Sequence, residues 1–192
     1  MNRALRFLAV WCLACVTGST YAAENETAPP RYLQAPGSSL TFTFTQLGAA
    51  TQGRFGRFST ELSYDVKNLA ASSLRVTVQI GSIDTQDAER DGVLVTPELF
   101  DARKHPVATF FAASLVQGPE GLQAPGKLTI RGVTRQLRLP LSIKPAGDGL
   151  ELSGSTSFKR LDFGIGEGDW QSTESVGDEV KVQYKVLLTR SP

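Results

Sequence analysis

The sequence predicts an all-β fold of about eight antiparallel strands with one short helical insertion. Apolar and polar residues alternate with a period of two in most segments, and turn-forming residues separate these segments at short intervals. The clearest case is Gly126–Ile143, where two alternating runs meet at Gly132. A lone glycine between two such runs favours a tight reversal, so this stretch is predicted to be a β-hairpin. Eight antiparallel strands either close into a barrel or fold as a sandwich, and the alternation does not choose between them.

The remaining strands are expected on both sides of this hairpin. In the segment Gly53–Asp65, Gly53 and Gly56 predict a bulge or a sharp bend. The same alternation predicts the full set of strands, which are Ser39–Thr45, Gly53–Asp65, Leu74–Ile80, Val107–Leu115, Leu122–Ile130, Val133–Ile143, Leu150–Phe158 and Glu179–Thr189.

One segment between the predicted strands lacks the period of two. Asp87–Leu99 carries helix-forming residues around Ala88–Leu94, which predicts a short helix there. The acidic residues at its start do not follow the order of a calcium-binding loop. They fit a solvated loop and the first turn of a helix, where negative charge is favourable.

The first residues have the layout of a secretory signal peptide. A basic start is followed by an apolar run and by small residues, which predicts cleavage after Ala22. Lipoprotein processing at Cys15 is the alternative, but the residues before it match that pattern poorly. Residues 23–37 are polar and proline-rich and are predicted to be a flexible lead-in, followed by the barrel domain at 38–192.

Composition excludes several classes of function. Both cysteines, Cys12 and Cys15, lie in the signal, so the mature chain has no disulfide or thiolate site. Loss of Arg3 and Arg6 leaves 18 basic against 19 acidic residues, a balance that gives no sign of nucleic-acid binding. About 170 residues remain, enough for one domain with a sizeable core.

No catalytic or metal-binding arrangement is visible. His105 is the single histidine and lies in a polar turn, without a paired nucleophile or a Gly-x-Ser-x-Gly motif. Gly164–Gly168 is glycine-rich but is not followed by a helical pattern, which excludes a dinucleotide loop. We therefore expect no enzyme activity, no metal and no cofactor. Trp170, just after this loop, is expected to be either a lid over a barrel mouth or an anchor for the loop.

Four segments of the chain resemble the YceI-like family of periplasmic, lipocalin-like proteins. They are Gly53–Asp65, then Gly81–Leu94 with Phe100-Asp101 and Pro106–Phe110, then Gly126–Leu139, and finally Arg160–Ile165 with Gly177–Val182. The segments occur in the family's order and together cover essentially the whole mature chain.

The resemblance implies an extended eight-stranded barrel whose pore takes a long isoprenoid chain, such as a polyprenyl phosphate or the tail of a quinone. Arg90 and Asp91 would then lie near the mouth and meet a head group. The residues themselves favour a structural Arg–Asp pair that fixes the helical insertion. The predicted ligand-binding set is Phe42, Phe44, Phe55, Val76, Val78, Arg90, Asp91, Phe110, Leu137, Leu139, Phe158, Trp170 and Val182.

Two alternatives to a periplasmic lipid carrier stay open. The first is an accessory module that delivers quinone to a membrane cytochrome b. The second is a stress-related barrel whose interior is filled by aromatic side chains, since the chain has ten phenylalanines. Whether the protein forms a homodimer is also open at this point.

Overall fold

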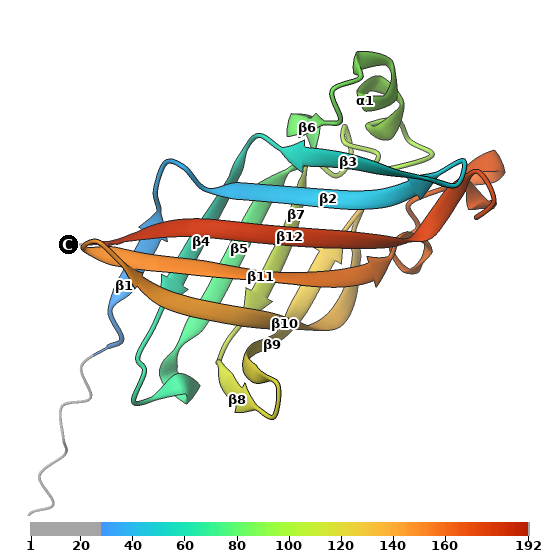
Figure 1. The fold of residues 1–192 in the computed structure, drawn as a ribbon. Coiled ribbons are helices and arrows are strands. Elements are labelled where there is room, and N and C mark those ends of the chain that lie inside the picture. Colours follow the sequence, from blue (N-terminus) through green and yellow to red (C-terminus); the bar gives the residue numbers. More distant parts are fainter. Residues whose placement is uncertain (1–27, 192) are drawn as a thin grey trace, which may run out of the picture.

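The computed structural model describes residues 28–191. The predicted signal peptide at residues 1–22 and the alternative lipid anchor at Cys15 lie outside the described residues. Within the described part, strands dominate and run along one elongated body (Figure 1). The strands are β1 (Arg31–Gln34), β2 (Ser39–Gln46), β3 (Ala49–Phe55), β4 (Phe58–Ser63), β5 (Ser73–Gln79), β6 (Ile83–Asp84), β7 (Val107–Ala112), β8 (Val116–Gly118), β9 (Gly121–Ile130), β10 (Val133–Ala146), β11 (Gly149–Lys159) and β12 (Val176–Arg190).

The sheet closes into an eight-stranded antiparallel barrel. Hydrogen-bonded neighbours follow the order β1-β4-β5-β7-β9-β10-β11-β12, and β12 pairs back with β1. The strands β2, β3 and β6 extend this wall, because β12 is long enough to pair with β1 near its end and with β2 before it. The predicted barrel is confirmed, and the sandwich alternative is excluded.

The hairpin predicted around Gly132 forms as expected. Ile130 and Val133 face each other across a two-residue turn in which both Arg131 and Gly132 have positive φ, 50° and 75°. Paired left-handed residues match the twist of the flanking strands. A side chain at position 132 would also come within 2.9 Å of the His105 ring, so this turn needs glycine.

The bend predicted in Gly53–Asp65 lies at Gly56-Arg57, where the segment divides into β3 and β4. At this bend the backbone forms two hydrogen bonds with Ser82. The Gly56 N–H donates to the Ser82 carbonyl at 2.9 Å, and the Arg57 N–H donates to the Ser82 hydroxyl at 3.0 Å. The bend lets β3 pair with β2 and β6, while β4 pairs with β1 and β5.

The prediction of a flexible lead-in at residues 23–37 is wrong for four of the residues that the structure describes. Residues 31–34 form β1, which pairs with β4 on one side and with β12 on the other. The four residues of β1 are too few to show a clear alternation, and their pairing partners come from distant parts of the chain. The barrel domain therefore begins before residue 38.

The helical insertion is the helix α1 (Ala88–Leu94), as predicted, and Asp87 caps its first turn by accepting from the Arg90 N–H. Short 3-10 turns occupy η1 (Leu69–Ala71), η2 (Ile80–Ser82), η3 (Arg160–Phe163) and η4 (Gly168–Gln171). In residues 28–191 none of the helical segments has the length and apolar character needed to span a bilayer.

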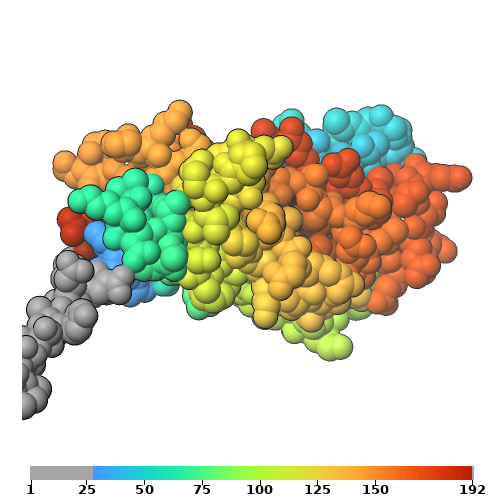
Figure 2. All heavy atoms as spheres, turned by 90° about the horizontal axis from the view of Figure 1, so that it is seen from below, coloured from blue at the N-terminus to red at the C-terminus, as the bar shows by residue number. Residues whose placement is uncertain are grey.

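The core plugs the barrel at the end where β1 and η1 lie. The buried side chains there come from six strands and one connection and belong to one cluster: Leu62, Leu74, Ala112, Leu115, Ala124, Leu141 and Leu188. The opposite end carries α1 and the connection between β11 and β12 (Figure 1). Seen from below, the molecule is elongated, with the β4–β5 connection and the β11–β12 connection at opposite ends (Figure 2).

Substitution of Leu74 tests this plug. Leu74 is 0% exposed, so Leu74→Ala removes buried contacts and leaves a cavity. We expect the free energy of unfolding to fall by about 2–5 kcal/mol, measured by urea denaturation. The matched control is Leu47→Ala, at a leucine that is 78% exposed. Equal effects of the two substitutions would show that the end is not packed as described.

Candidate ligand-binding cavity

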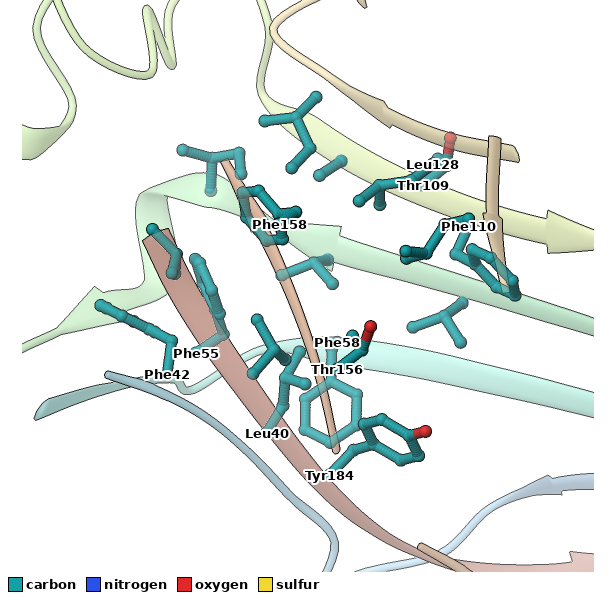
Figure 3. Close-up of a pocket in the computed structure, with 18 of the residues that line it drawn as sticks. Leu40, Phe42, Phe55, Phe58, Thr109, Phe110, Leu128, Thr156, Phe158 and Tyr184 are labelled. Carbon is teal, nitrogen blue, oxygen red and sulfur yellow. The ribbon is translucent and has the colours of Figure 1, made fainter. Parts of the chain in front are cut away.

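An apolar cavity of about 180 Å³ lies inside the barrel. Every strand of the closed barrel except β1 contributes to its wall, and β2 and β3 add to it. Figure 3 shows aromatic side chains from separate strands directed around this space. The wall is made of Leu40, Phe42, Phe44, Phe55, Phe58, Thr60, Leu74, Val76, Val78, Ile80, Leu94, Leu99, Phe100, Ala108, Thr109, Phe110, Leu128, Ile130, Leu137, Leu139, Leu152, Thr156, Phe158, Arg160, Ile165, Val176, Val180, Val182, Tyr184 and Val186.

The alternation of each strand explains why this wall is apolar. In β12, Val180, Val182 and Tyr184 face the cavity, while Lys181 and Gln183 face outward. Successive side chains of a strand point to opposite faces, so a closed barrel collects one face of every strand inside. Several inward side chains remain only partly buried, including those of Val76, Val78, Leu137, Phe158 and Val182, because they border empty space.

Aromatic rings form the wall near α1. The Phe42 ring lies 5.2 Å from the Phe55 ring and 6.2 Å from the Phe44 ring, centroid to centroid. Gly53, opposite Phe42 in the β2–β3 pair, leaves the space that the Phe42 ring fills, since a side chain there would collide with it. The arrangement depends on a glycine at that position.

A second cavity of about 250 Å³ adjoins the first, and the two share Phe44, Leu94, Leu99 and Val176. The rest of its wall is mostly polar and comes from α1, from β2 and from the β11–β12 connection: Gln46, Asp87, Glu89, Arg90, Val93 and Trp170. The apolar space thus opens toward a polar rim at the α1 end. We refer to this second cavity as the mouth.

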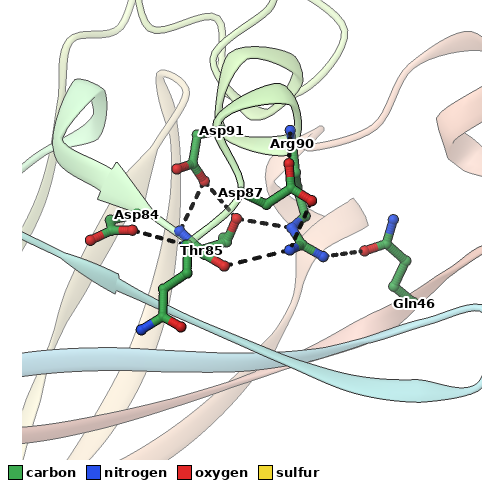
Figure 4. A network of polar contacts seen from close by, with 7 residues as sticks. Gln46, Asp84, Thr85, Asp87, Arg90 and Asp91 are labelled. Carbon is green, nitrogen blue, oxygen red and sulfur yellow. Dashed lines mark hydrogen bonds and ion pairs between the residues drawn. The ribbon is translucent and has the colours of Figure 1, made fainter.

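Arg90 and Asp91 both bind Thr85 and do not pair with each other (Figure 4). The Arg90 guanidinium donates to the Thr85 hydroxyl at 2.9 Å and to the Gln46 side-chain oxygen at 3.1 Å, and it lies 3.3 Å from the Asp87 carboxylate. Asp91 accepts from the Thr85 backbone N–H at 2.9 Å and from its hydroxyl at 2.6 Å. The network fixes α1 against β2 and β6, so the expected direct Arg–Asp pair is replaced by bonds through Thr85.

Among the residues that the structure describes, Arg160 is the one charged side chain in the wall of the apolar cavity, and it is only 3% exposed. Its guanidinium donates to four backbone carbonyls, those of Ile165, Ser172, Val176 and Gly177, at 2.8–3.2 Å. Desolvation lowers the pKa of Arg160, and the nearby Asp178 carboxylate partly offsets this. These bonds fold the connection between η3 and β12 around the arginine.

The glycine-rich loop that precedes η4 is also tied down. Arg131, from the β9–β10 turn, donates to the Gly164 carbonyl at 2.6 Å and lies 2.7 Å from the Glu167 carboxylate. Trp170 packs against the buried cluster that contains Phe163 and also lines the mouth. Trp170 therefore lies where it can anchor the loop and also where it can cover the mouth as a lid.

The thirteen residues predicted to bind ligand divide into three groups. Arg90 and Trp170 line the mouth, and Asp91 lines neither cavity. The other ten line the apolar cavity: Phe42, Phe44, Phe55, Val76, Val78, Phe110, Leu137, Leu139, Phe158 and Val182. Their contact with a ligand stays a prediction.

The sequence prediction left out the polar atoms of the wall. Thr60, Thr109 and Thr156 line the apolar cavity, and Tyr184 does so while its hydroxyl donates to the Pro140 carbonyl. Burial raises the pKa of Tyr184. The alternation of β4 and of β12 already puts Thr60 and Tyr184 on the inward face, which is the one signal that could have identified them.

The described residues contain no group of three or more histidine, cysteine, aspartate or glutamate side chains placed to hold a metal ion. The His105 ring instead packs beside the Gly132 turn.

The Arg131–Glu167 pair predicts a pH dependence. The hydrogen bond from Arg131 holds the pKa of Glu167 below its ordinary value of 4.5. A carboxyl group with a lowered pKa stabilises the folded state above its ordinary pKa, and this contribution is lost as the pH falls through the lowered value. Carboxyl titration by NMR should show a Glu167 pKa below 4.5 that returns to its ordinary value in Arg131→Met. An unchanged pKa in this variant would contradict the pairing.

Comparison with known proteins supports one family assignment. The model of the YceI-like domain matches residues 32–188. A UPF0312 protein from Enterobacter sp. strain 638 is 32% identical over 174 residues, covering 86% of this chain and 88% of that protein. A UPF0312 protein from Vibrio cholerae is 37% identical over 136 residues, covering 67% and 72% of the two chains.

Two solved structures share the fold. Burkholderia cenocepacia BcnA superimposes with a TM-score of 0.74 at 28% identity, covering 78% of this chain and 95% of that one. A polyisoprenoid-binding domain from Saccharophagus degradans, implicated in plant cell wall breakdown, superimposes with a TM-score of 0.66 at 15% identity, a likeness of fold alone. It covers 85% of this chain and 99% of that domain. Because the family match extends from β1 into the last part of β12, this chain belongs to the YceI-like family.

Proposed function

We propose that this protein is a periplasmic carrier that holds a long-chain isoprenoid lipid inside its barrel. One observation carries the proposal: the interior contains empty apolar space, bounded by inward side chains from almost every strand. Burial of a hydrocarbon chain there supplies about 0.8 kcal/mol for each CH₂ group, before the cost of ordering the chain.

The shape of the site suits an amphiphile. The plugged end, where Leu62 and Leu188 lie, closes the cavity, and the mouth offers polar groups from Gln46 and α1. A chain would lie inside while one end reaches the polar rim. The shared fold with a polyisoprenoid-binding domain agrees with this assignment. The periplasmic location rests on the signal-like pattern of residues 1–22.

The empty volume also separates this proposal from the barrel with a filled core. Aromatic rings such as those of Phe42 and Phe110 stand at the wall and leave about 180 Å³ between them. Interiors of ordinary domains are close-packed, with few voids larger than a water molecule. A space of this size is expected where the interior serves a ligand.

A charge placed in the cavity tests the proposal. Val78→Glu and Leu139→Glu each introduce a carboxylate that loses hydration beside a hydrocarbon chain, so we expect retention of an added polyprenol to be abolished at pH 8. Retention is measured by mass spectrometry of lipid extracts after gel filtration, and circular dichroism checks that the variants fold.

Val107→Glu is the matched control, because Val107 is outside the cavity on β7 and 39% exposed. This control should retain the polyprenol at the level of the unaltered protein. Full retention by a folded Val78→Glu or Leu139→Glu protein would exclude the cavity as the binding site.

A further inference from the structure

Thr60 is a buried polar residue without a protein partner. Its side chain lines the apolar cavity from β4, the residue is 1% exposed, and its hydroxyl makes no hydrogen bond with any described residue. The alternation of β4 fixes its direction, since Ser59 and Glu61 on either side face outward while Thr60 and Leu62 are buried. The hydroxyl is therefore presented to the interior.

Hydrocarbon side chains surround Thr60 on the inward face of the wall. Phe58 and Leu62 precede and follow it on the same face of β4, and Val76 is its partner across the β4–β5 pair. A water molecule in such a site needs two to four polar partners, and the side chains of Phe58, Leu62 and Val76 offer none. An unpaired buried hydroxyl is unfavourable, so a site that retains one points to a partner from outside the chain.

We propose that the bound lipid carries a neutral hydrogen-bonding oxygen, a hydroxyl or a carbonyl, that lies inside the barrel beside Thr60. The inference rests on the proposed function and names the chemical class of its ligand. A pure hydrocarbon tail would leave the Thr60 hydroxyl unpaired. A lipid that carries a hydroxyl or a carbonyl at the depth of Thr60 would satisfy it, whichever end of the lipid reaches the mouth.

The charges of the site indicate why this oxygen is neutral. Among the described residues, Arg160 is the one cationic side chain in the cavity wall, and its guanidinium already donates to four carbonyls, two in the connection before β12 and two at the start of β12. Thr60 lies among residues of the cluster at the plugged end, while Ile165, bonded by Arg160, belongs to the cluster at the α1 end. A phosphate beside Thr60 would lose its hydration without a counter-ion.

The competing explanation is a bond within the protein. Gln34 on β1 also has a buried side-chain oxygen without a partner, and β1 is the neighbour of β4. Gln34 follows Leu33, the last residue of β1 paired with β4. Rotation of its amide toward Thr60 would remove the need for a ligand oxygen, so the test must measure the coupling of these two residues.

Binding of matched probes to Thr60→Val tests the inference. The probes are geranylgeraniol, a ubiquinone with four prenyl units, geranylgeranyl phosphate and the twenty-carbon hydrocarbon without oxygen. Val keeps the shape of Thr and removes the hydroxyl, so the substitution should weaken binding of the alcohol or the quinone by about two- to tenfold. It should leave the affinity for the hydrocarbon and the phosphate unchanged.

Two controls accompany this variant. Thr60→Ser keeps the hydroxyl and should retain the preference for the oxygenated probe, while Thr77→Val makes the same change outside the cavity, opposite Ser59, and should alter no affinity. If binding of the alcohol depends on Thr60, the ligand oxygen is a hydroxyl. If binding of the quinone depends on Thr60, the ligand oxygen is a carbonyl. Equal loss for all four probes would show a packing effect and overturn the inference.

Further outcomes separate this inference from the proposed function. If the probes bind but Thr60→Val changes no affinity, the lipid carrier stands and the neutral oxygen is wrong. If no probe binds, the carrier itself fails. Without ligand, the changes in the free energy of unfolding caused by Thr60→Val and by Gln34→Leu should be additive in the double variant. A coupling between them would show a Thr60–Gln34 bond and overturn the inference.

Discussion

The strand β1 closes the sheet into a barrel, and the apolar interior and the two different ends follow from this closure. This strand has four residues, Arg31–Gln34, and pairs with β4 on one side and β12 on the other. An open sheet would leave two edges of unpaired backbone groups and would admit water to its inner face. Once the ring is closed, the alternation of each strand suffices to make the interior apolar.

The two ends of the closed barrel differ in the kind of side chain that they carry. The end at β1 is plugged by aliphatic side chains such as Leu62 and Leu188, whereas the α1 end is bounded by arginines that bind elements of the fold. Arg90 fixes α1, Arg131 fixes the glycine-rich loop, and Arg160 folds the chain that leads into β12. Each of these guanidiniums donates to protein acceptors, and the bonds hold the segments at the α1 end in place.

Much of this architecture could be predicted from the sequence, because its signals are local. The hairpin at Gly132, the bend at Gly56 and the helix at Ala88–Leu94 each follow from residues that are neighbours in the chain. The apolar wall follows from alternation, and ten of the thirteen predicted ligand-binding residues line it. The family resemblance was needed to choose a barrel over a sandwich.

Features that depend on distant pairing were not predictable in this way. The strand β1 is too short to show a period, and its partners lie about thirty residues later and at the far end of the chain. The same reason applies to Arg160, whose four carbonyl partners lie up to 17 residues away. It also applies to Thr60, because only the folded wall shows that its hydroxyl has no hydrogen-bond partner among the described residues. The resemblance places Asp91 near a head group, whereas the residues favour a structural role, and in the fold Asp91 accepts a hydrogen bond from Thr85.

Native mass spectrometry would show whether the barrel holds a lipid in the cell. The protein would be purified without detergent from the periplasm of the organism that makes it and then ionised under non-denaturing conditions. We expect a complex with a discrete added mass that matches an isoprenoid lipid and disappears on organic extraction. A bare protein mass, in a preparation whose empty barrel also takes up no added isoprenoid, would contradict this expectation.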